Sequence, residues 1–226
     1  MNYDDWHPIY ERILADFGFD AAADRRARDL LAERARPFDL ARIRVDGLTV
    51  AIAGGADSLA EDVPIARTAD TVFATSNAAE VLEDADVTVD LLVTDLDKNL
   101  ETAIAMTQAG RPVAVHAHGD NIPLLERALE EMDLGQVIAT TQAEPRGDVR
   151  NFGGFTDGDR AAFLADHLGA ASLTFPGWDF DDPTVDPVKR RKLAWAERLL
   201  FLLENRRNQR FSVLDGRRAA IEDLSR

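Results

Sequence analysis

Two histidines, an aspartate and an asparagine stand close together at the end of the apolar stretch VAVHAHGDN. His116 and His118 are two residues apart, so on a strand their side chains point to the same side. Asp120 or Asn121 can begin the helix that follows. These residue types favour a role beside phosphate or a catalytic magnesium ion. The alternatives are a His-His-Asp site for a transition metal and a strand end whose polar groups are satisfied by the backbone.

Asp95 and Asp97 form a second polar group, directly after the apolar run LLVT. Mg²⁺ prefers hard oxygen ligands, often one or two carboxylates together with substrate phosphates. Without a cation, two close carboxylates repel each other, which raises the pKa of one of them. The pair therefore predicts a metal site. The structural alternative is a turn at Asp95 followed by a helix cap at Asp97.

Small residues follow the first apolar run in the turn GGADS, which begins at Gly54 and Gly55 and ends at Ser58. This turn has neither the full dinucleotide fingerprint nor a P-loop lysine. Its backbone N–H groups can nevertheless approach a phosphate at the start of a helix. Asn77 follows the next apolar run in the same way. We predict that this group contacts the nucleotide, and the alternative is a plain turn into a helix.

The stretch NFGGFTDGDRA places two phenylalanines around a pair of glycines. Glycine lets a flat ligand approach the backbone, and the rings of Phe152 and Phe155 can stack on a heterocycle. Asn151 and Asp157 can hydrogen-bond its edge, and Thr156 opens a helix. The predicted ligand is therefore a flat heterocycle. The alternative is a glycine loop anchored in the core by the two rings.

The chain is strongly acidic, with 41 Asp and Glu against 26 Lys and Arg and a net charge of −15. Such a surface repels phosphate backbones, so we expect no nucleic-acid partner. Anionic substrates would need a metal or a local basic patch, and the cluster KRRK supplies one through Lys189 and Lys192. The alternative for this cluster is a solvated helix face. Acidity with few lysines also favours a saline cytoplasm, where salt screens self-repulsion, and the alternative is an ordinary acidic protein from a GC-rich genome.

Six short apolar runs alternate with helical stretches after an N-terminal helical segment. Such runs are typical of buried parallel strands joined by helices, so we predict a doubly wound α/β fold with a mostly parallel sheet. We expect an N-terminal helical segment (1–40), an α/β catalytic domain (41–205) and a charged C-terminal tail (206–226). The expected strands are 48–54, 71–76, 91–95, 112–117, 137–142 and 172–177, and the expected helices among them are 77–84, 98–109, 121–132 and 157–168.

These expected strands place the acidic pair, the histidines and the small-residue turn each at a strand's carboxyl end. In doubly wound sheets, ligands bind beyond the carboxyl ends of the strands, where the strand order reverses. We therefore expect the acidic pair, the histidines and the small-residue turn to converge on one edge of the sheet. A cluster of this kind is stronger grounds for a site than any single motif.

Four stretches together, VTDLDKNLE, AVHAHGDN, NFGGFTDGDRA and KRRKLAWAERLLFLL, resemble the archaeal 6-hydroxymethyl-7,8-dihydropterin diphosphokinases. The resemblance covers roughly residues 40 to 205. That family is similar to the thiamine diphosphokinases in its nucleotide-binding core. The turn GGADS departs from the Gly-x-Gly-Pro-Ser-Leu-like form of the family, which puts the nucleotide contact of this turn in doubt.

This resemblance implies an ATP- and Mg²⁺-dependent enzyme of tetrahydromethanopterin or folate biosynthesis. It would transfer a diphosphoryl group to the pterin hydroxymethyl and release AMP. Asp95 and Asp97 fall where the family's metal-binding acids are expected. The predicted catalytic residues are Asp95, Asp97, Asp120, His116 and His118. The predicted nucleotide-binding residues are Gly54, Gly55, Ser58, Asn77, Asn121, Lys189 and Lys192. The predicted pterin-binding residues are Asn151, Phe152, Phe155, Thr156 and Asp157.

Two other classes of function fit parts of the pattern. A nucleotide-sugar glycosyltransferase can hold its donor through an Asp-x-Asp pair and a metal, and a non-catalytic module can sense nucleotide or pterin. The Phe-Gly-Gly-Phe stretch suits a flat heterocycle better than a sugar. We expect a cytoplasmic protein without a membrane span. The sequence leaves the oligomeric state open, a homodimer included.

Overall fold

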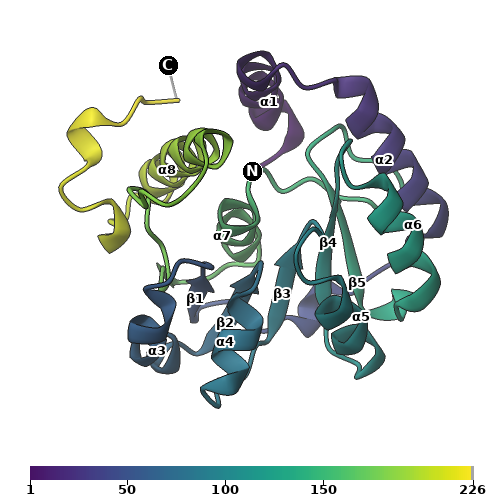
Figure 1. Ribbon diagram of the computed structural model, residues 1–226, viewed down its shortest axis with the longest axis horizontal. Helices are drawn as coiled ribbons and strands as arrows, with labels where there is room; N and C mark the ends of the chain where they lie inside the picture. The colour runs from purple at the N-terminus through teal and green to yellow at the C-terminus, as the bar shows by residue number, and fades with distance from the viewer. Residues whose placement is uncertain (225–226) are drawn as a thin grey trace. The chain divides into compact units, whose positions relative to one another are not determined.

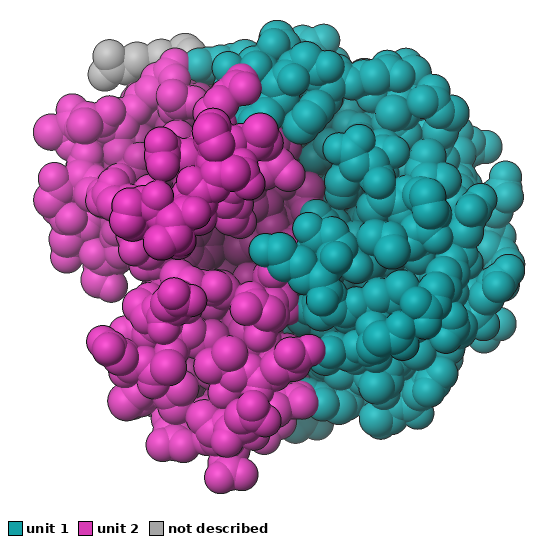
Figure 2. Space-filling model, in the orientation of Figure 1, with its two compact units in different colours: residues 1–44, 90–153 teal, residues 45–89, 154–226 magenta. Residues whose placement is uncertain are grey.

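The computed structural model describes residues 1–224 and divides the chain into two compact units. Unit 1 contains residues 1–44 and 90–153, and unit 2 contains residues 45–89 and 154–226 (Figure 2). Each unit is therefore built from two separate stretches of the chain. The N-terminal helices fall in unit 1, and the C-terminal segment falls in unit 2.

Among the described residues, three strands lie in each unit, and the strands that pair within a unit are parallel. The order is β5-β4-β3 in unit 1 and β2-β1-β6 in unit 2. Most strand residues are buried Val, Ile, Leu, Ala or Thr, as expected for parallel strands covered on both faces. The strands are β1 Thr49–Ala53, β2 Thr71–Thr75, β3 Leu91–Thr94, β4 Val113–Ala117, β5 Val137–Thr141 and β6 Ser172–Thr174.

Helices precede, connect and follow these strands. The helices are α1 Tyr3–Phe17, α2 Ala21–Arg34, α3 Leu59–Thr68, α4 Ala78–Asp84, α5 Leu100–Gln108, α6 Ile122–Glu131, α7 Asp157–His167 and α8 Pro187–Arg207. Four short 3₁₀ turns lie at Leu40–Arg42, Leu134–Gln136, Ser212–Leu214 and Arg218–Ala220. The α/β fold class expected from the alternating pattern is confirmed.

In unit 2 the helices lie on both faces of the strands (Figure 1). Helices α3 and α4 pack against β1 and β2 on one face, and α7 packs against the same two strands on the other, with α8 beyond it. Strand β1 pairs with β2 on one side and with β6 on the other. The chain therefore leaves β1 toward β2 but returns to the opposite side of β1. This reversal is a switch point of the kind at which doubly wound sheets bind ligands.

In unit 1, α2 packs against α6, β4 and β5, so the predicted N-terminal helical segment exists and covers part of the sheet. Helix α1 ends at Gly18, which adopts a left-handed conformation with φ of 71°. Asn2 and Asp20 cap the starts of α1 and α2 through side-chain oxygens, which accept backbone N–H groups.

Helix α3 was not among the expected helices. Pro64 lies inside it, and proline normally ends a helical pattern because it lacks an N–H group. The helix forms nevertheless, because Leu59, Val63 and Ala66 recur at helical spacing and are buried.

The segment that follows α8 is held by buried contacts. Phe211 and Leu214 are almost fully buried. The carboxylate of Glu204 in α8 accepts hydrogen bonds from Nε and Nη2 of Arg218, both at 2.7 Å, and from the backbone N–H of Phe211 at 2.5 Å. Among the described residues, no helix combines the length and the apolar character required to cross a bilayer.

Candidate active site

The turn after β3 carries Asp95 and Asp97 in a fixed geometry. Thr94 Oγ1 accepts the backbone N–H of Leu96 at 2.8 Å and also bonds Asn99 Oδ1 at 2.8 Å. Leu96 has φ of 73°, a left-handed conformation that costs a non-glycine residue about 1 kcal/mol or more. The strained turn leaves Asp95 half-buried and Asp97 exposed. Both carboxylates are therefore placed at the end of one strand, as the sequence predicted.

His118 connects this acidic turn to the turn after β4. Its Nε2 lies 3.4 Å from Oδ2 of Asp95, and the two side chains are 17% and 19% exposed. Its Nδ1 accepts the backbone N–H of Asp120 at 3.3 Å. Asp120 itself is exposed. The structure thus brings Asp95, His118 and Asp120 into one neighbourhood of unit 1.

His116 is part of strand β4 and is only 2% exposed. Its Nδ1 lies 3.0 Å from Oγ1 of Thr140 on β5. The two histidine rings are neighbours, with centroids 6.4 Å apart. Because His116 lies within the sheet and His118 beyond its end, His118 is the more accessible of the two for proton transfer or substrate contact.

Asn121 joins the ends of β3 and β4. Its Nδ2 donates to the carbonyl oxygens of Asp95 at 2.8 Å and His116 at 2.7 Å, and its Oδ1 accepts the N–H of His118 at 3.1 Å. Asn121 is the N-cap residue of α6, but its side chain makes no capping hydrogen bond to that helix. Its amide therefore fixes the spacing of the two turns, and the nucleotide contact predicted for Asn121 stays a prediction.

The donor set of the acidic turn suits Mg²⁺. Asp95 and Asp97 supply carboxylate oxygens from one turn, and magnesium is commonly held by one or two carboxylates with phosphates and water completing its shell. Within residues 1–224, no group of three or more His, Asp or Glu side chains is arranged to hold a metal ion by itself. The predicted site would accordingly need oxygen atoms from the substrate.

The predicted phosphate turn of unit 2 lies at the switch point between β1 and β6. Backbone N–H groups of Gly54 and Ala56 donate to the carbonyl oxygens of Pro176 at 2.9 Å and Gly177 at 3.1 Å. A Cβ on Gly54 would lie 2.5 Å from the Gly177 oxygen, so only glycine allows this approach. The two loops that follow β1 and β6 are therefore one packed structure.

Asn77 lies against the second glycine of the same turn. A Cβ on Gly55 would come within 2.3 Å of Asn77 Oδ1. The preceding residue, Ser76, has φ of 51°, a second strained position after a strand. Asn77 is exposed and precedes α4 without capping it. Ser58 is the N-cap residue of α3, but its side chain makes no capping hydrogen bond, and its hydroxyl oxygen is buried. Unit 2 thus brings Gly54, Gly55 and Asn77 together.

Trp178, which is not among the predicted site residues, supports this turn. Its indole Nε1 donates to the carbonyl oxygen of Ile52 in β1 at 2.8 Å. A Cβ on Gly158 in α7 would lie 2.5 Å from the Trp178 ring. Glycine at position 158 therefore makes room for the indole, a relation between positions 20 apart that periodicity does not reveal.

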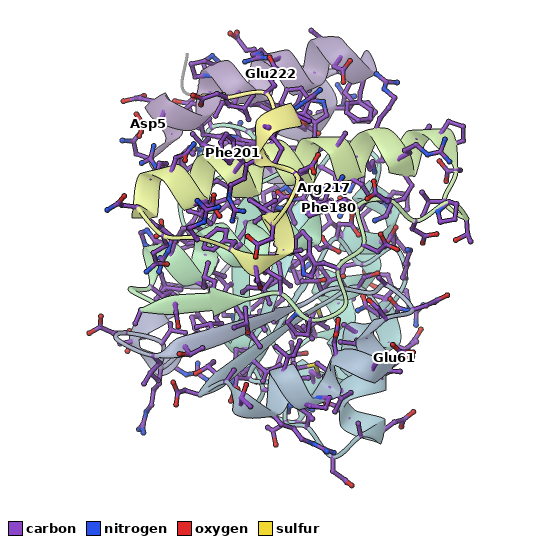
Figure 3. The ribbon with its side chains drawn as sticks, turned by 90° about the vertical axis from the view of Figure 1, so that its left-hand side faces the viewer. Asp5, Glu61, Phe180, Phe201, Arg217 and Glu222 are labelled. Carbon is purple, nitrogen blue, oxygen red and sulfur yellow. The ribbon has the colours of Figure 1, made fainter. Side chains whose placement is uncertain are left out.

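The C-terminal segment holds the loop that contains Trp178. Arg217 forms ion pairs with Asp181 in this loop and with Glu197 in α8. Figure 3 shows Arg217 beside Phe180, and its guanidinium carbon lies 5.4 Å from the centre of the Phe180 ring. Hydrogen bonds to the carboxylates of Asp181 and Glu197 raise the pKa of Arg217. Arg217 of the C-terminal segment thus links the loop after β6 to α8.

The predicted pterin-binding stretch divides between the units. Asn151 and Phe152 belong to unit 1, and Phe155 belongs to unit 2. Nδ2 of Asn151 donates to the carbonyl oxygen of Ala143 at 2.8 Å, and its Oδ1 accepts the N–H of Gly153 at 2.8 Å. Phe152 and Phe155 are 7% and 5% exposed. Both rings are mostly buried here, so stacking on a ligand stays a prediction for them.

Thr156 and Asp159 form a capping box at the start of α7. Thr156 Oγ1 donates to Asp159 at 2.6 Å, and Asp159 accepts the N–H groups of Thr156 and Phe155. Burial raises the pKa of Asp159, while these hydrogen bonds act in the opposite direction. Asp157 forms an ion pair with Arg160 at 3.1 Å. Thr156 and Asp157 therefore have local structural roles, and their contact with pterin stays a prediction.

Lys189 and Lys192 lie in the first turns of α8 and are half-buried. Asp186 caps this helix by accepting the backbone N–H groups of Val188 at 2.7 Å and Lys189 at 2.8 Å. The hydrogen bond from Lys189 N–H is the main cause that lowers the pKa of Asp186. Lys189 and Lys192 therefore lie at a helix start with an acidic neighbour, and their contact with the nucleotide stays a prediction.

A family model shows where this chain belongs. The model described as 6-hydroxymethylpterin diphosphokinase MptE-like matches residues 30–184. This chain belongs to that family. The span includes the acidic turn, the turn after β4 with His118 (the histidine turn) and the turn after β1 with Gly54 and Gly55 (the glycine turn). It ends before Lys189 and Lys192. The family resemblance inferred from the sequence motifs is confirmed.

Three archaeal relatives extend the match over most of the chain. A protein of Methanothermobacter thermautotrophicus is 39% identical over 221 residues, which cover 88% of this chain and 94% of the relative. A Pyrococcus furiosus protein is 33% identical over 95% of this chain and 99% of its own length. A Methanocaldococcus jannaschii protein is 29% identical over 91% and 97%. All three are named 6-hydroxymethyl-7,8-dihydropterin pyrophosphokinase.

Proposed function

We propose that this MptE-like chain transfers a diphosphoryl group from ATP to the hydroxymethyl group of 6-hydroxymethyl-7,8-dihydropterin, with Mg²⁺ as cofactor. The observation that carries this proposal is its 39% identity, over 88% of the chain, to a relative named for the pterin pyrophosphokinase activity. The position of Asp95 and Asp97 in one turn, beside His118, supports it. The reaction would take place in the cytoplasm of a cell with a saline interior.

The reaction requires one bond to form and one to break. The pterin hydroxyl oxygen attacks the β-phosphorus of ATP, and the bond from that phosphorus to the oxygen bridging the α- and β-phosphates breaks. The products are the pterin diphosphate and AMP, and the hydroxyl proton leaves to a base or to water. Such a transfer depends on positioning and electrostatic stabilisation more than on covalent catalysis by the protein.

Asp95 and Asp97 are the residues that would hold Mg²⁺, and the bound ion would neutralise charge on the phosphates. His118 and Asp120 are the candidates to accept the hydroxyl proton, since they are the more exposed polar groups of their turn. In unit 2, the phosphate contact would fall to the start of α3 at Ser58, because the N–H groups of Gly54 and Ala56 already donate to carbonyl oxygens of the loop after β6.

Product analysis tests the proposal. The full chain is incubated with the dihydropterin, Mg²⁺ and ATP labelled at the γ-phosphate. The products are separated and identified by mass spectrometry. We expect AMP and a labelled pterin diphosphate in equal amounts. ADP with a pterin monophosphate would refute diphosphoryl transfer. Turnover of nucleotide sugars would support a glycosyltransferase instead, and binding of both ligands without products would support a sensing module.

A further inference from the structure

A buried carboxylate on helix α2 accepts a hydrogen bond from the backbone of the histidine turn. Asp24 is 4% exposed. Its Oδ1 accepts the backbone N–H of Gly119 at 2.7 Å. Its Oδ2 accepts the hydroxyl of Tyr10 at 2.7 Å and Nε2 of Gln142 at 2.8 Å. One carboxylate therefore connects α1, the turn after β4 and the loop after β5, all within unit 1.

Gly119 is the residue through which Asp24 reaches the candidate site, since it lies between His118 and Asp120. A Cβ on Gly119 would lie 2.5 Å from Cβ of Ala23, so the turn is seated directly against α2. The neighbouring His118 ring accepts the N–H of Asp120 and faces Asp95. A displacement of Gly119 would therefore move the imidazole relative to the acidic turn.

The three donors to Asp24 are neutral groups, and burying a carboxylate is costly unless hydrogen bonds compensate for lost water. The network is braced further by Trp6, whose Nε1 donates to the carbonyl oxygen of Gln142 at 2.8 Å. An apolar side chain would pack between α1 and the sheet at lower cost. The carboxylate's distinctive contribution is to fix the Gly119 N–H, and with it the turn.

We propose that Asp24 is a positioning residue for the reaction: it holds Gly119 so that His118 and Asp120 are correctly placed toward Asp95. This inference rests on the proposed function. Asp24, Trp6 and Tyr10 precede residue 30, where the match to the family model begins. The N-terminal helices would thus contribute to catalysis without touching the substrate.

The first variant is Asp24→Asn, which retains the shape of the side chain and removes its charge. We expect kcat to fall about tenfold, while the KM values for ATP and pterin change less than about twofold, because an indirect contact affects the transition state through His118. The chain has four histidines, so the His118 ring signal in the proton NMR spectrum can be assigned by its loss in His118→Gln. We expect that signal to shift in Asp24→Asn at constant pH.

Tyr10→Phe is the matched control, since it removes a donor to the same carboxylate and leaves the Gly119 contact in place. We expect a melting temperature lower by about 3 °C, with kcat within about twofold of the unmodified chain and an unmoved His118 signal. Equal losses of kcat in Asp24→Asn and Tyr10→Phe, in proportion to lost stability, would show that Asp24 has only a structural role.

Gly119→Ala provides a second test that does not depend on how Asp24→Asn folds. The new Cβ would collide with Ala23 and push the turn away from α2. We expect a loss of kcat that Ala23→Gly partly restores in the double variant. A folded Asp24→Asn with unchanged kcat and an unmoved His118 signal would overturn the proposal, as would an unchanged kcat in Gly119→Ala. If the unmodified chain made no AMP, the proposed function would fail, whereas the NMR shift would still test the positioning.

Discussion

Nε2 of His118 lies 3.4 Å from Oδ2 of Asp95, so the turns that follow β3 and β4 meet through their side chains. Asn121 reinforces this contact, because its amide donates to the carbonyl oxygen of Asp95. Each turn also contains its own constraint, the left-handed Leu96 in one and Gly119 against α2 in the other. Carboxylate and imidazole are therefore positioned as a pair.

The metal proposal predicts that Asp97→Ala loses at least about 100-fold in turnover. Asp97 is exposed, so we expect the melting temperature to change by less than about 2 °C. AMP formation would be measured against magnesium concentration. The exposed neighbour Lys98 supplies the control, and Lys98→Ala should keep its activity within about twofold. Full magnesium-dependent turnover by Asp97→Ala would remove Asp97 from the metal site.

The glycine turn offers a contrast between two adjacent substitutions. In Gly55→Ala, the new Cβ meets the flexible end of Asn77 at 2.3 Å, so Asn77 should move aside with little cost in stability. If Asn77 contacts the nucleotide, loss of that hydrogen bond should raise the KM for ATP about tenfold. Unchanged ATP kinetics in a variant of normal stability would exclude this contact.

In Gly54→Ala, by contrast, the new Cβ meets the backbone oxygen of Gly177 at 2.5 Å, which cannot move without shifting the loop after β6. We expect the free energy of unfolding to fall by about 2 kcal/mol. Chemical denaturation would measure this loss. Gly135→Ala, whose Cβ would meet only the Asp133 carboxylate at 3.2 Å, is the control and should lose far less.

Stacking by the two phenylalanines predicts a selective effect on pterin. Phe152→Leu or Phe155→Leu should weaken pterin binding and leave ATP binding nearly unchanged, as calorimetric titration of each ligand would show. Leucine fills most of the volume, so we expect about 1 kcal/mol of lost stability. Phe163→Leu, in the fully buried core of α7, is the control. Parallel losses for both ligands would identify Phe152 and Phe155 as core residues only.

The ion pair of Glu204 with Arg218 predicts a pH-dependent stability. Burial acts to raise the pKa of Glu204, but the hydrogen bonds from Arg218 and from Phe211 N–H outweigh it and lower the pKa below its usual range. Glu204→Gln should therefore lower the free energy of unfolding by about 2 kcal/mol at pH 7. Because the folded pKa is lowered, this contribution is complete above the ordinary pKa of about 4.3 and disappears as the pH falls through the lowered value.

Denaturant unfolding of both proteins between pH 7 and pH 2 would show whether the two stability curves converge in acid. Glu61→Gln, an exposed glutamate on α3, is the control, with a difference of about 0.5 kcal/mol or less at any pH. A difference between Glu204→Gln and the parent that stayed constant down to pH 2 would contradict the ion-pair explanation.

The Arg217 contacts predict that the C-terminal segment stabilises the loop after β6. Arg217→Ala removes the ion pairs to Asp181 and Glu197 and the contact with Phe180. Amide hydrogen exchange in residues 177–181 should become faster. Arg217→Lys should restore part of the protection, since lysine keeps the charge but cannot reach two carboxylates as a planar fork. Equal exchange in all three proteins would show that Arg217 does not hold this loop.

The sequence by itself determined the elements and the polar residues at their ends. Buried strands and amphipathic helices depend on neighbours within a few positions, so the apolar runs and the helix beginning after Thr156 could be predicted directly. The four stretches VTDLDKNLE, AVHAHGDN, NFGGFTDGDRA and KRRKLAWAERLLFLL together were sufficient to identify the family. Helix α3 was missed because Pro64 is a strong local signal against a helix that burial stabilises.

Only the tertiary structure decided which of these residues meet. Asp24 and Gly119 are separated by 95 positions, and nothing in the spacing of either predicts their hydrogen bond. The burial of His116 depends on Thr140 of the neighbouring strand, and the room for Trp178 depends on Gly158. Such contacts follow from strand order and helix placement, which are set by the packing of the whole core and not by local preference.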